Sequence, residues 1–147
     1  MQSYKTFFLM IAASTVLMFV MMYLNTYEMS HVYFSETRAY MAVMMGAGMA
    51  IVMLLFMWKM YANRKANLAI LACAAVVFCL SLWLVRSQTT VRDVSWMKAM
   101  IPHHSIAIMT SSRATITDPR VRDLADRIIR AQEREIGEMQ ALIKDLE

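Results

Sequence analysis

The twenty residues AYMAVMMGAGMAIVMLLFMW (residues 39–58) contain no charged side chain, and they decide how this chain can fold. A helix of this length rises about 30 Å, which matches the thickness of the hydrocarbon core of a bilayer. Two further uncharged stretches, residues 7–24 and 68–85, are each 18 residues long. The sequence therefore predicts three transmembrane helices, at about residues 7–24, 39–58 and 68–85, within a membrane domain of residues 1–87.

The composition agrees with a chain that contacts membrane lipid. Of the 147 residues, 59% are apolar, which is more than an ordinary soluble domain contains. The first apolar stretch resembles a secretory signal, but the residues that follow it, NTYEMSH (25–31), offer no small-x-small cleavage site. We therefore expect the first stretch to be retained as a transmembrane helix.

The distribution of charge predicts the orientation in the membrane. Residues 1–86 hold six basic and two acidic residues and so account for the whole net charge of +4, whereas residues 87–147 are neutral. This distribution of basic residues does not indicate a surface that binds nucleic acid. Three basic residues crowd the short second loop: Lys59, Arg64 and Lys65. The positive-inside rule then places this loop and the N-terminus in the cytoplasm, although Arg86 and Arg92 oppose it. We expect a bacterial inner (plasma) membrane, with the C-terminal domain periplasmic or extracellular.

Residues 88–147 are predicted to form an antiparallel helical hairpin. A first helix is expected from about residue 90 to 114. Asp118 is a good N-cap and Pro119 suits the first position of a second helix that runs to Glu147. A short turn between two helices makes them antiparallel neighbours. The fold class is therefore all-α.

Both helices of the hairpin carry polar residues on an apolar seam with alternating spacings of three and four. The seam of the second helix comprises Ala125, Ile128, Gln132, Glu135, Met139, Leu142 and Leu146, and that of the first comprises Met97, Met100, His104, Ala107 and Ser111. Further apolar residues widen the face beyond this seam: Ile101, Ile106, Ile108, Val121, Leu124, Ile129, Ile136 and Ile143. One partner helix cannot bury an apolar face this wide. We therefore expect a homodimer in which two hairpins complete a four-helix bundle.

The stretch MIPHHSIAIM (residues 100–109) combines adjacent imidazoles with thioethers. Such a mixed set suits Cu(I) better than zinc. Methionine is also frequent in the second predicted span, at every fourth residue from Met41 to Met57. This stripe is either ordinary packing or a thioether track for Cu(I) or Ag(I). Beside it, Ala42, Gly46 and Ala50 form a small-residue stripe that lets another helix approach, in this chain or in a second copy.

The two segments WMKAMIPHHSIAIM and DPRVRDLADRIIRAQEREIGEMQALI resemble the bacterial domain of unknown function 305 family over residues 93–147. The resemblance implies a ferritin-like helical bundle that is exported and associated with copper. Its motif residues here are Met100, His103, His104, Met109, Gln132, Glu135 and Met139. Two departures exist: residues 88–147 form one hairpin, half of a four-helix bundle, and Ala141 replaces the family's tryptophan.

We therefore predict membrane-anchored binding of Cu(I), or of silver as Ag(I), for metal tolerance or homeostasis. The predicted ligands are Met100, His103, His104, Met109, Glu135 and Met139, while Gln132 would orient a histidine. Met29 and His31, on the same side of the membrane, are candidate accessory ligands. Periplasmic copper proteins are the expected partners, and we expect neither nucleic acid nor an enzymatic activity. The alternative is a structural or interaction protein whose buried His–Glu layer only specifies helix pairing.

Overall fold

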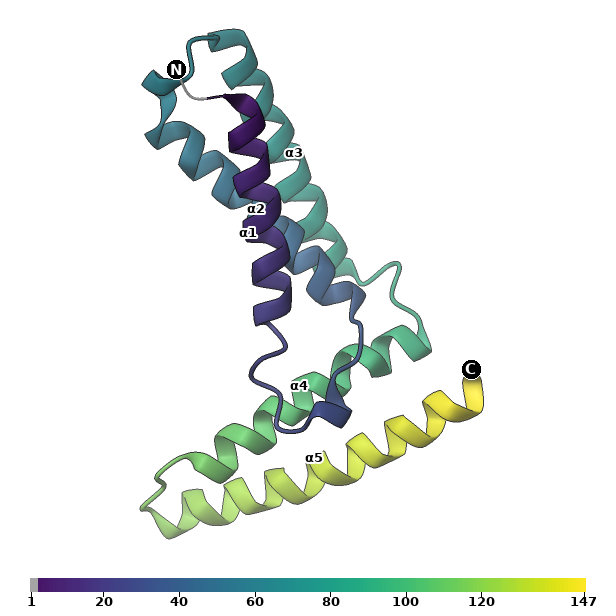
Figure 1. The fold of residues 1–147 in the computed structure, drawn as a ribbon. Helices are drawn as coiled ribbons and strands as arrows, with labels where there is room; N and C mark the ends of the chain where they lie inside the picture. The colour runs from purple at the N-terminus through teal and green to yellow at the C-terminus, as the bar shows by residue number, and fades with distance from the viewer. Residues whose placement is uncertain (1–2) are drawn as a thin grey trace. The chain divides into compact units, whose positions relative to one another are not determined.

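The computed structural model describes residues 3–147, and all regular structure within this range is helical. Within these described residues, five α-helices and two short 3-10 helices follow one another (Figure 1). Their bounds are α1 Tyr4–Met21, η1 Met29–His31, α2 Glu36–Phe56, η2 Trp58–Met60, α3 Arg64–Ser87, α4 Asp93–Arg113 and α5 Pro119–Leu146. The predicted all-α fold class is confirmed for the described residues.

The chain divides into two compact units. The first, which we call the apolar unit, comprises the described residues up to Met21 together with Thr37–Thr90, and so contains α1, α3 and nearly all of α2. The second, the hairpin unit, comprises Met22–Glu36 and Val91–Glu147. The segment between α1 and α2 thus groups with α4 and α5, although it is far from them in the sequence.

Helices α1, α2 and α3 are long and apolar enough to cross a membrane. They correspond to the three predicted spans, with α1 beginning and ending three residues earlier than expected. Most of their large apolar side chains are not covered by the chain itself; Leu17, Leu55 and Val76 are all more than half exposed. This large exposed apolar surface is consistent with membrane association.

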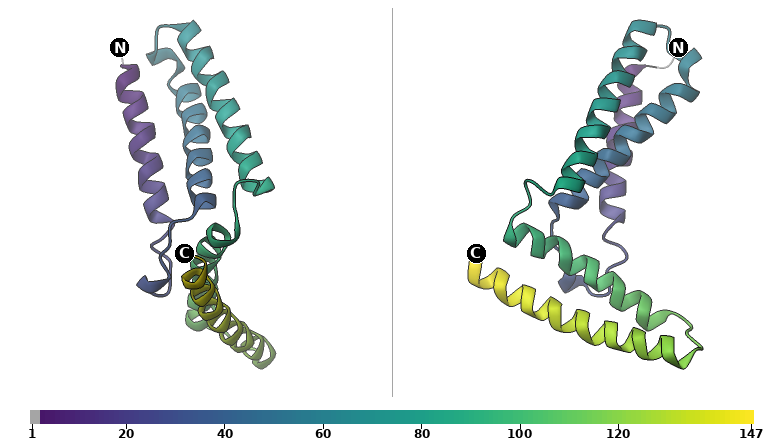
Figure 2. Two further views of the ribbon diagram at one scale, coloured as in Figure 1. Left: turned by 90° about the vertical axis from the view of Figure 1, so that its right-hand side faces the viewer. Right: turned by 180° about the vertical axis from the view of Figure 1, so that it is seen from behind.

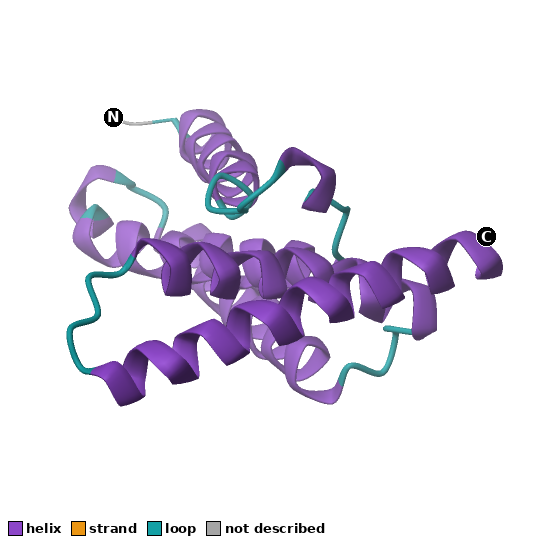
Figure 3. Cartoon of the chain, turned by 90° about the horizontal axis from the view of Figure 1, so that it is seen from below, coloured by secondary structure: helices purple, strands orange, loops and turns teal. Residues whose placement is uncertain are grey.

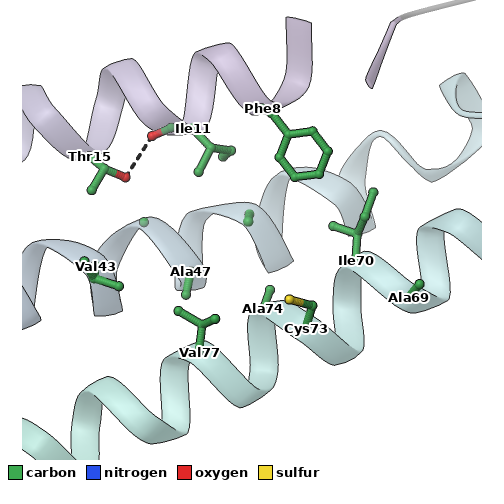
Figure 4. Close-up of a pocket in the computed structure, with 12 residues that line it drawn as sticks. Phe8, Ile11, Thr15, Val43, Ala47, Ala69, Ile70, Cys73, Ala74 and Val77 are labelled. Atoms are coloured by element: carbon green, nitrogen blue, oxygen red, sulfur yellow. Dashed lines mark hydrogen bonds between the residues drawn. The ribbon is translucent and has the colours of Figure 1, made fainter. Parts of the chain in front are cut away.

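The small-residue stripe of α2 packs inside the chain. Ala42, Gly46 and Ala50 are buried, and a Cβ added to Gly46 would overlap Oγ1 of Thr15 on α1. The Thr15 hydroxyl donates a hydrogen bond to the carbonyl of Ile11 (2.8 Å; Figure 4). The stripe therefore serves the close approach of α1, as the small-xxx-small pattern predicts, and its partner helix is in the same chain.

An apolar groove of about 450 Å³ lies between the three helices of the apolar unit, lined by residues such as Phe8, Ala47 and Val77 (Figure 4). The methionines of the predicted stripe, from Met41 in α2 to Met57 just after its end, are half-buried. Met53 and Met57 pack against the cluster that contains Phe7 and Leu54. Two methionines of this stripe therefore have a packing role.

In the hairpin unit, α4 and α5 run antiparallel and side by side (Figures 2 and 3). The carboxylate of Asp118 accepts a hydrogen bond from the backbone N–H of Arg120 (2.8 Å), and Pro119 occupies the first turn, as the sequence predicts. Pro102 lies inside α4 and is buried. At the open end of the hairpin, Lys98 of α4 forms an ion pair with Glu147.

The predicted seam of the hairpin agrees with the true interface only in part. Met97, Ala125 and Met139 are buried as expected, but the interface is displaced towards an isoleucine-rich stripe. The buried cluster consists of Met97, Ile101, Ile108, Ile136, Met139 and Ile143. Leu142 and Leu146, which were expected in the seam, are 51% and 60% exposed. Two apolar stripes with helical spacing run side by side along α5, and the sequence cannot tell which one faces α4. The isoleucine-rich stripe does, which leaves Glu135 at the edge of the interface.

Candidate metal site

His104 and Glu135 form the central contact of the candidate site. His104 Nε2 lies 2.8 Å from Glu135 Oε2, across the edge of the α4–α5 interface. The side chain of His104 is 12% exposed and that of Glu135 is 41% exposed. The pair is thus neither fully buried nor fully exposed.

Both ring nitrogens of His104 have acceptors nearby. Its Nδ1 lies 3.0 Å from the carbonyl oxygen of Met100, four residues earlier on α4. A carbonyl can only accept, so Nδ1 carries hydrogen and Nε2 is the atom that faces the carboxylate. A metal ion that binds Nε2 would therefore compete with the Glu135 carboxylate for this nitrogen.

Two methionines share helix faces with this pair. Met139 is buried in the cluster between α4 and α5, and Met100 packs against that cluster. Met100 is four residues before His104 and Met139 is four residues after Glu135, so each thioether shares a helix face with one member of the pair. The structure thus brings Met100, His104, Glu135 and Met139 to one region of the hairpin. Met97 belongs to the same cluster, although sequence reasoning treated it as part of the seam and not as a ligand.

Of the other predicted site residues, His103 and Met109 lie further round α4, whereas Gln132 shares a helix face with Glu135. His103 is exposed, and its ring centre is 6.2 Å from that of His104. Met109 is half-buried and follows His104 by five residues, which turns its direction by about 140° around α4. Gln132 is half-buried on α5, one turn before Glu135.

The candidate accessory residues lie on the segment 22–36, which docks on α4. His31 is buried, and its Nδ1 is 3.0 Å from the hydroxyl oxygen of Ser105. The same oxygen accepts a hydrogen bond from the backbone N–H of Tyr27 (2.7 Å). Met29 is 86% exposed. Sequence reasoning missed Ser105, because no local pattern links it to a residue 74 positions away.

Within residues 3–147, no group of three or more His, Cys, Asp or Glu side chains is arranged to hold a metal ion. A metal at His104 and Glu135 would therefore need other ligands. The nearby thioethers of Met100 and Met139 are soft donors, and soft donors select Cu(I) or Ag(I) over harder ions. The donors present fit such an ion better than they fit zinc or magnesium.

Comparison with known proteins bears on this same hairpin. Residues 84–146 match the family model described as "Domain of unknown function (DUF305)". This DUF305 match covers the whole of α4 and α5 and confirms the domain resemblance predicted from the sequence. The chain is also 28% identical over 143 residues to "Uncharacterized protein L153" of Acanthamoeba polyphaga mimivirus, with 92% of each chain covered. No solved structure matches the chain.

Proposed function

We propose that this protein is a membrane-anchored binder of Cu(I) or Ag(I), with its site on the DUF305-like hairpin, and that it serves metal tolerance or homeostasis. The three apolar helices would hold the hairpin at the membrane surface. In the orientation that the charges predict, the hairpin would face the periplasm or the exterior of a bacterial cell.

One observation carries the proposal: the imidazole of His104 lies at the accessible edge of the hairpin, next to Glu135 and on the same helix face as the thioether of Met100. An imidazole and a thioether on one face, four residues apart, can bind a single soft ion without unfolding the helix. Glu135 is exposed enough to turn away from Nε2 and release it.

The ligand set that follows from the geometry is centred on Met100 and His104. Met139 is the candidate thioether from α5, and Glu135 either binds the ion directly or orients the imidazole. His103, which is exposed beside His104, is a candidate for delivering the ion to the site. Met109 points elsewhere around α4 and falls outside this set.

A second function is favoured by the same contact. Both nitrogens of His104 already have acceptors in the folded chain, as expected for a polar layer that only specifies how α4 and α5 pair. In that case the protein would be a structural or interaction protein without a metal. The two functions predict different stabilities, and different effects of Ag(I) on the unfolding temperature, when His104 and Glu135 are replaced by apolar side chains.

The deciding experiment is anaerobic competition for Cu(I) between a chromophoric chelator and the full-length protein in detergent micelles. The variant His104→Ala/Met100→Leu should bind Cu(I) at least tenfold more weakly than the wild type. Two matched controls should retain wild-type affinity: Met109→Leu, on another face of the same helix, and Met53→Leu, in the apolar unit. Equal affinity in all four proteins would exclude the site.

A second pair of variants separates the two functions. His104→Leu/Glu135→Leu replaces the polar layer with apolar side chains. If the layer is structural, an apolar pair of similar volume should leave the stability unchanged or raise it by about 1–4 kcal/mol, but it should reduce the specificity of helix pairing. If the site binds metal, Ag(I) should raise the unfolding temperature of the wild type and have no such effect on this variant.

A further inference from the structure

An exposed apolar stripe on α5 is left uncovered within the hairpin unit. Leu124, Leu142 and Leu146 are each about half exposed or more, and Ile128 is half-buried. They lie on the same side of α5 as Glu135, because each is separated from it by seven or eleven residues, which are close to whole numbers of helical turns. The stripe is distinct from the isoleucine-rich stripe that faces α4.

The stripe is symmetric about Glu135. Ile128 and Leu142 lie seven residues on either side of it, and Leu124 and Leu146 lie eleven residues on either side. A two-fold axis that passes beside Glu135 would therefore set Leu124 opposite the partner's Leu146, and Ile128 opposite the partner's Leu142. Apolar side chains would therefore meet apolar side chains on both sides of Glu135, while Glu135 itself would lie beside the axis.

The charges beside the stripe favour the same arrangement. Arg127 and Arg134 lie on one edge of it in the first part of α5, and Glu138 and Asp145 continue the same edge in the last part. All four are exposed. An antiparallel pair of α5 helices would bring the basic part of this edge against the acidic part of the same edge in the partner. A parallel pair would instead set this edge against the opposite edge, where Ile136 and Ile143 already face α4.

We propose that a second copy of this chain covers the stripe, with the two α5 helices antiparallel and the two-fold axis beside Glu135. Such a contact is isologous, with the same surface used by both copies. The two hairpins then form a four-helix bundle. The charge pattern on the edge determines the direction of pairing, and the apolar stripe determines its register.

This arrangement would make the candidate metal site a shared one, an extension that rests on the proposed function. Glu135 of each copy would lie near the axis, each with its own His104 and Met100 nearby. Two carboxylates that approach across an axis repel each other unless a cation or the neighbouring imidazoles offset their charge. A bound Cu(I) or Ag(I) should therefore strengthen the pairing of the two copies.

The test of the pairing is made without metal, on the full-length protein in detergent, by sedimentation velocity over a range of protein concentrations. Arg127→Glu/Arg134→Glu makes the whole edge acidic, and Glu138→Arg/Asp145→Arg makes it basic. Each double variant should dimerise at least tenfold more weakly than the wild type. The quadruple variant, in which the charges are exchanged, should recover wild-type dimerisation, as should an equimolar mixture of the two double variants. The proposal would be overturned if the wild type stays monomeric. It would also be overturned if the charge variants dimerise as strongly as the wild type.

A cross-linking experiment tests the direction and the register. In a background with Cys73→Ser and Cys79→Ser, a mixture of Leu124→Cys and Leu146→Cys proteins should form a mixed disulfide dimer. Neither variant alone should cross-link efficiently. Self-cross-linking of Leu124→Cys would show a parallel pair. If both cysteines are protected from oxidation in lipid nanodiscs and no dimer forms, the bilayer covers the stripe. Either outcome rejects the proposal.

The link to metal has its own readout. Ag(I) should strengthen dimerisation of the wild type at least tenfold and should have no effect on the dimerisation of His104→Ala. If the dimer forms but Ag(I) does not change the strength of dimerisation, the proposed pairing stands and the shared metal site is rejected. Conversely, Cu(I) binding by a monomer would retain the proposed function and remove the pairing.

Discussion

Ser105 of α4 and His31 of the segment before α2 meet in the folded chain, with 3.0 Å between the serine hydroxyl oxygen and Nδ1 of the imidazole. Ser105 is completely buried and also accepts the backbone N–H of Tyr27. A single hydroxyl thus holds two points of the 22–36 segment on the helix that carries His103 and His104. Removal of this hydroxyl leaves the buried imidazole of His31 and the part-buried backbone N–H of Tyr27 without this partner.

Ser105→Ala should therefore destabilise the hairpin unit by about 1–3 kcal/mol, the usual cost of unsatisfied buried groups. The measurement is thermal unfolding together with hydrogen exchange of the Tyr27 amide, which should become faster. Ser112→Ala is the matched control, because the exposed Ser112 hydroxyl bonds only locally, to the carbonyl of Met109. Equal exchange of Tyr27 in the wild type and Ser105→Ala would contradict the docking contact.

Gly46→Ala should destabilise the apolar unit. The new methyl group would overlap Thr15 Oγ1 and would also lie 3.3 Å from the Cβ and Cγ2 atoms of Thr15. Overpacking of this kind costs about 1–3 kcal/mol. Thr15→Ala in the same chain should restore most of the loss, which we would measure by thermal unfolding in detergent.

Gly137→Ala is the contrasting substitution. No atom lies within 4 Å of a Cβ added there, and Gly137 is an exposed residue inside α5. Alanine favours a helix interior over glycine by about 1 kcal/mol, so this variant should be stabilised. If Gly46→Ala were tolerated as well as Gly137→Ala, the close approach of α1 to α2 would be wrong.

Asp118 should make the stability of the hairpin depend on pH in acid. The hydrogen bonds from the Arg120 side chain, and next from the Arg120 backbone, hold the pKa of the Asp118 carboxyl below its usual range. A pKa lowered in the folded state means that this stabilisation is present above the unfolded pKa, about 4, and is lost as the pH falls through the folded pKa. The stability difference between the wild type and Asp118→Ala should therefore shrink below about pH 4.

Asp118→Asn separates the two roles of this residue. Asparagine is as good an N-cap as aspartate, but it carries no charge for Arg120. The variant should keep most of the stability at neutral pH and lose the pH dependence. The measurement is thermal unfolding at several pH values between 3 and 7, and a pH dependence in Asp118→Asn equal to that of the wild type would assign it to another group.

The position of the true seam can be tested by truncation. Ile136→Ala should cost about 2–5 kcal/mol, because it leaves a cavity in the α4–α5 cluster. Leu142→Ala should cost much less, because this side chain is half exposed. Both are best measured in the Arg127→Glu/Arg134→Glu background, where the proposed dimer is weakened. A larger loss for Leu142→Ala would restore the seam predicted from the sequence.

Much of the local structure follows from the sequence alone. The uncharged runs predict α1, α2 and α3 to within a few residues, because helix length and apolar composition decide together whether a segment can cross a bilayer. Asp118 and Pro119 predict the start of α5, because capping is a local interaction. The motif residues of the hairpin predict the DUF305 match, because the motif can be recognised in short stretches of the sequence.

The tertiary structure alone decided which faces meet. Two apolar stripes run along α5, and their spacings are equally helical, so periodicity could not show that Ile136 and Ile143 face α4 while Leu142 and Leu146 do not. The position of Glu135 at the edge beside His104 follows from that choice. The sequence could not predict the docking of His31 on Ser105 either. A contact across 74 residues depends on the path of the whole chain and leaves no local pattern. Helix propensity, capping and apolar length act over a few residues, whereas the pairing of faces depends on the sum of all contacts in the folded unit.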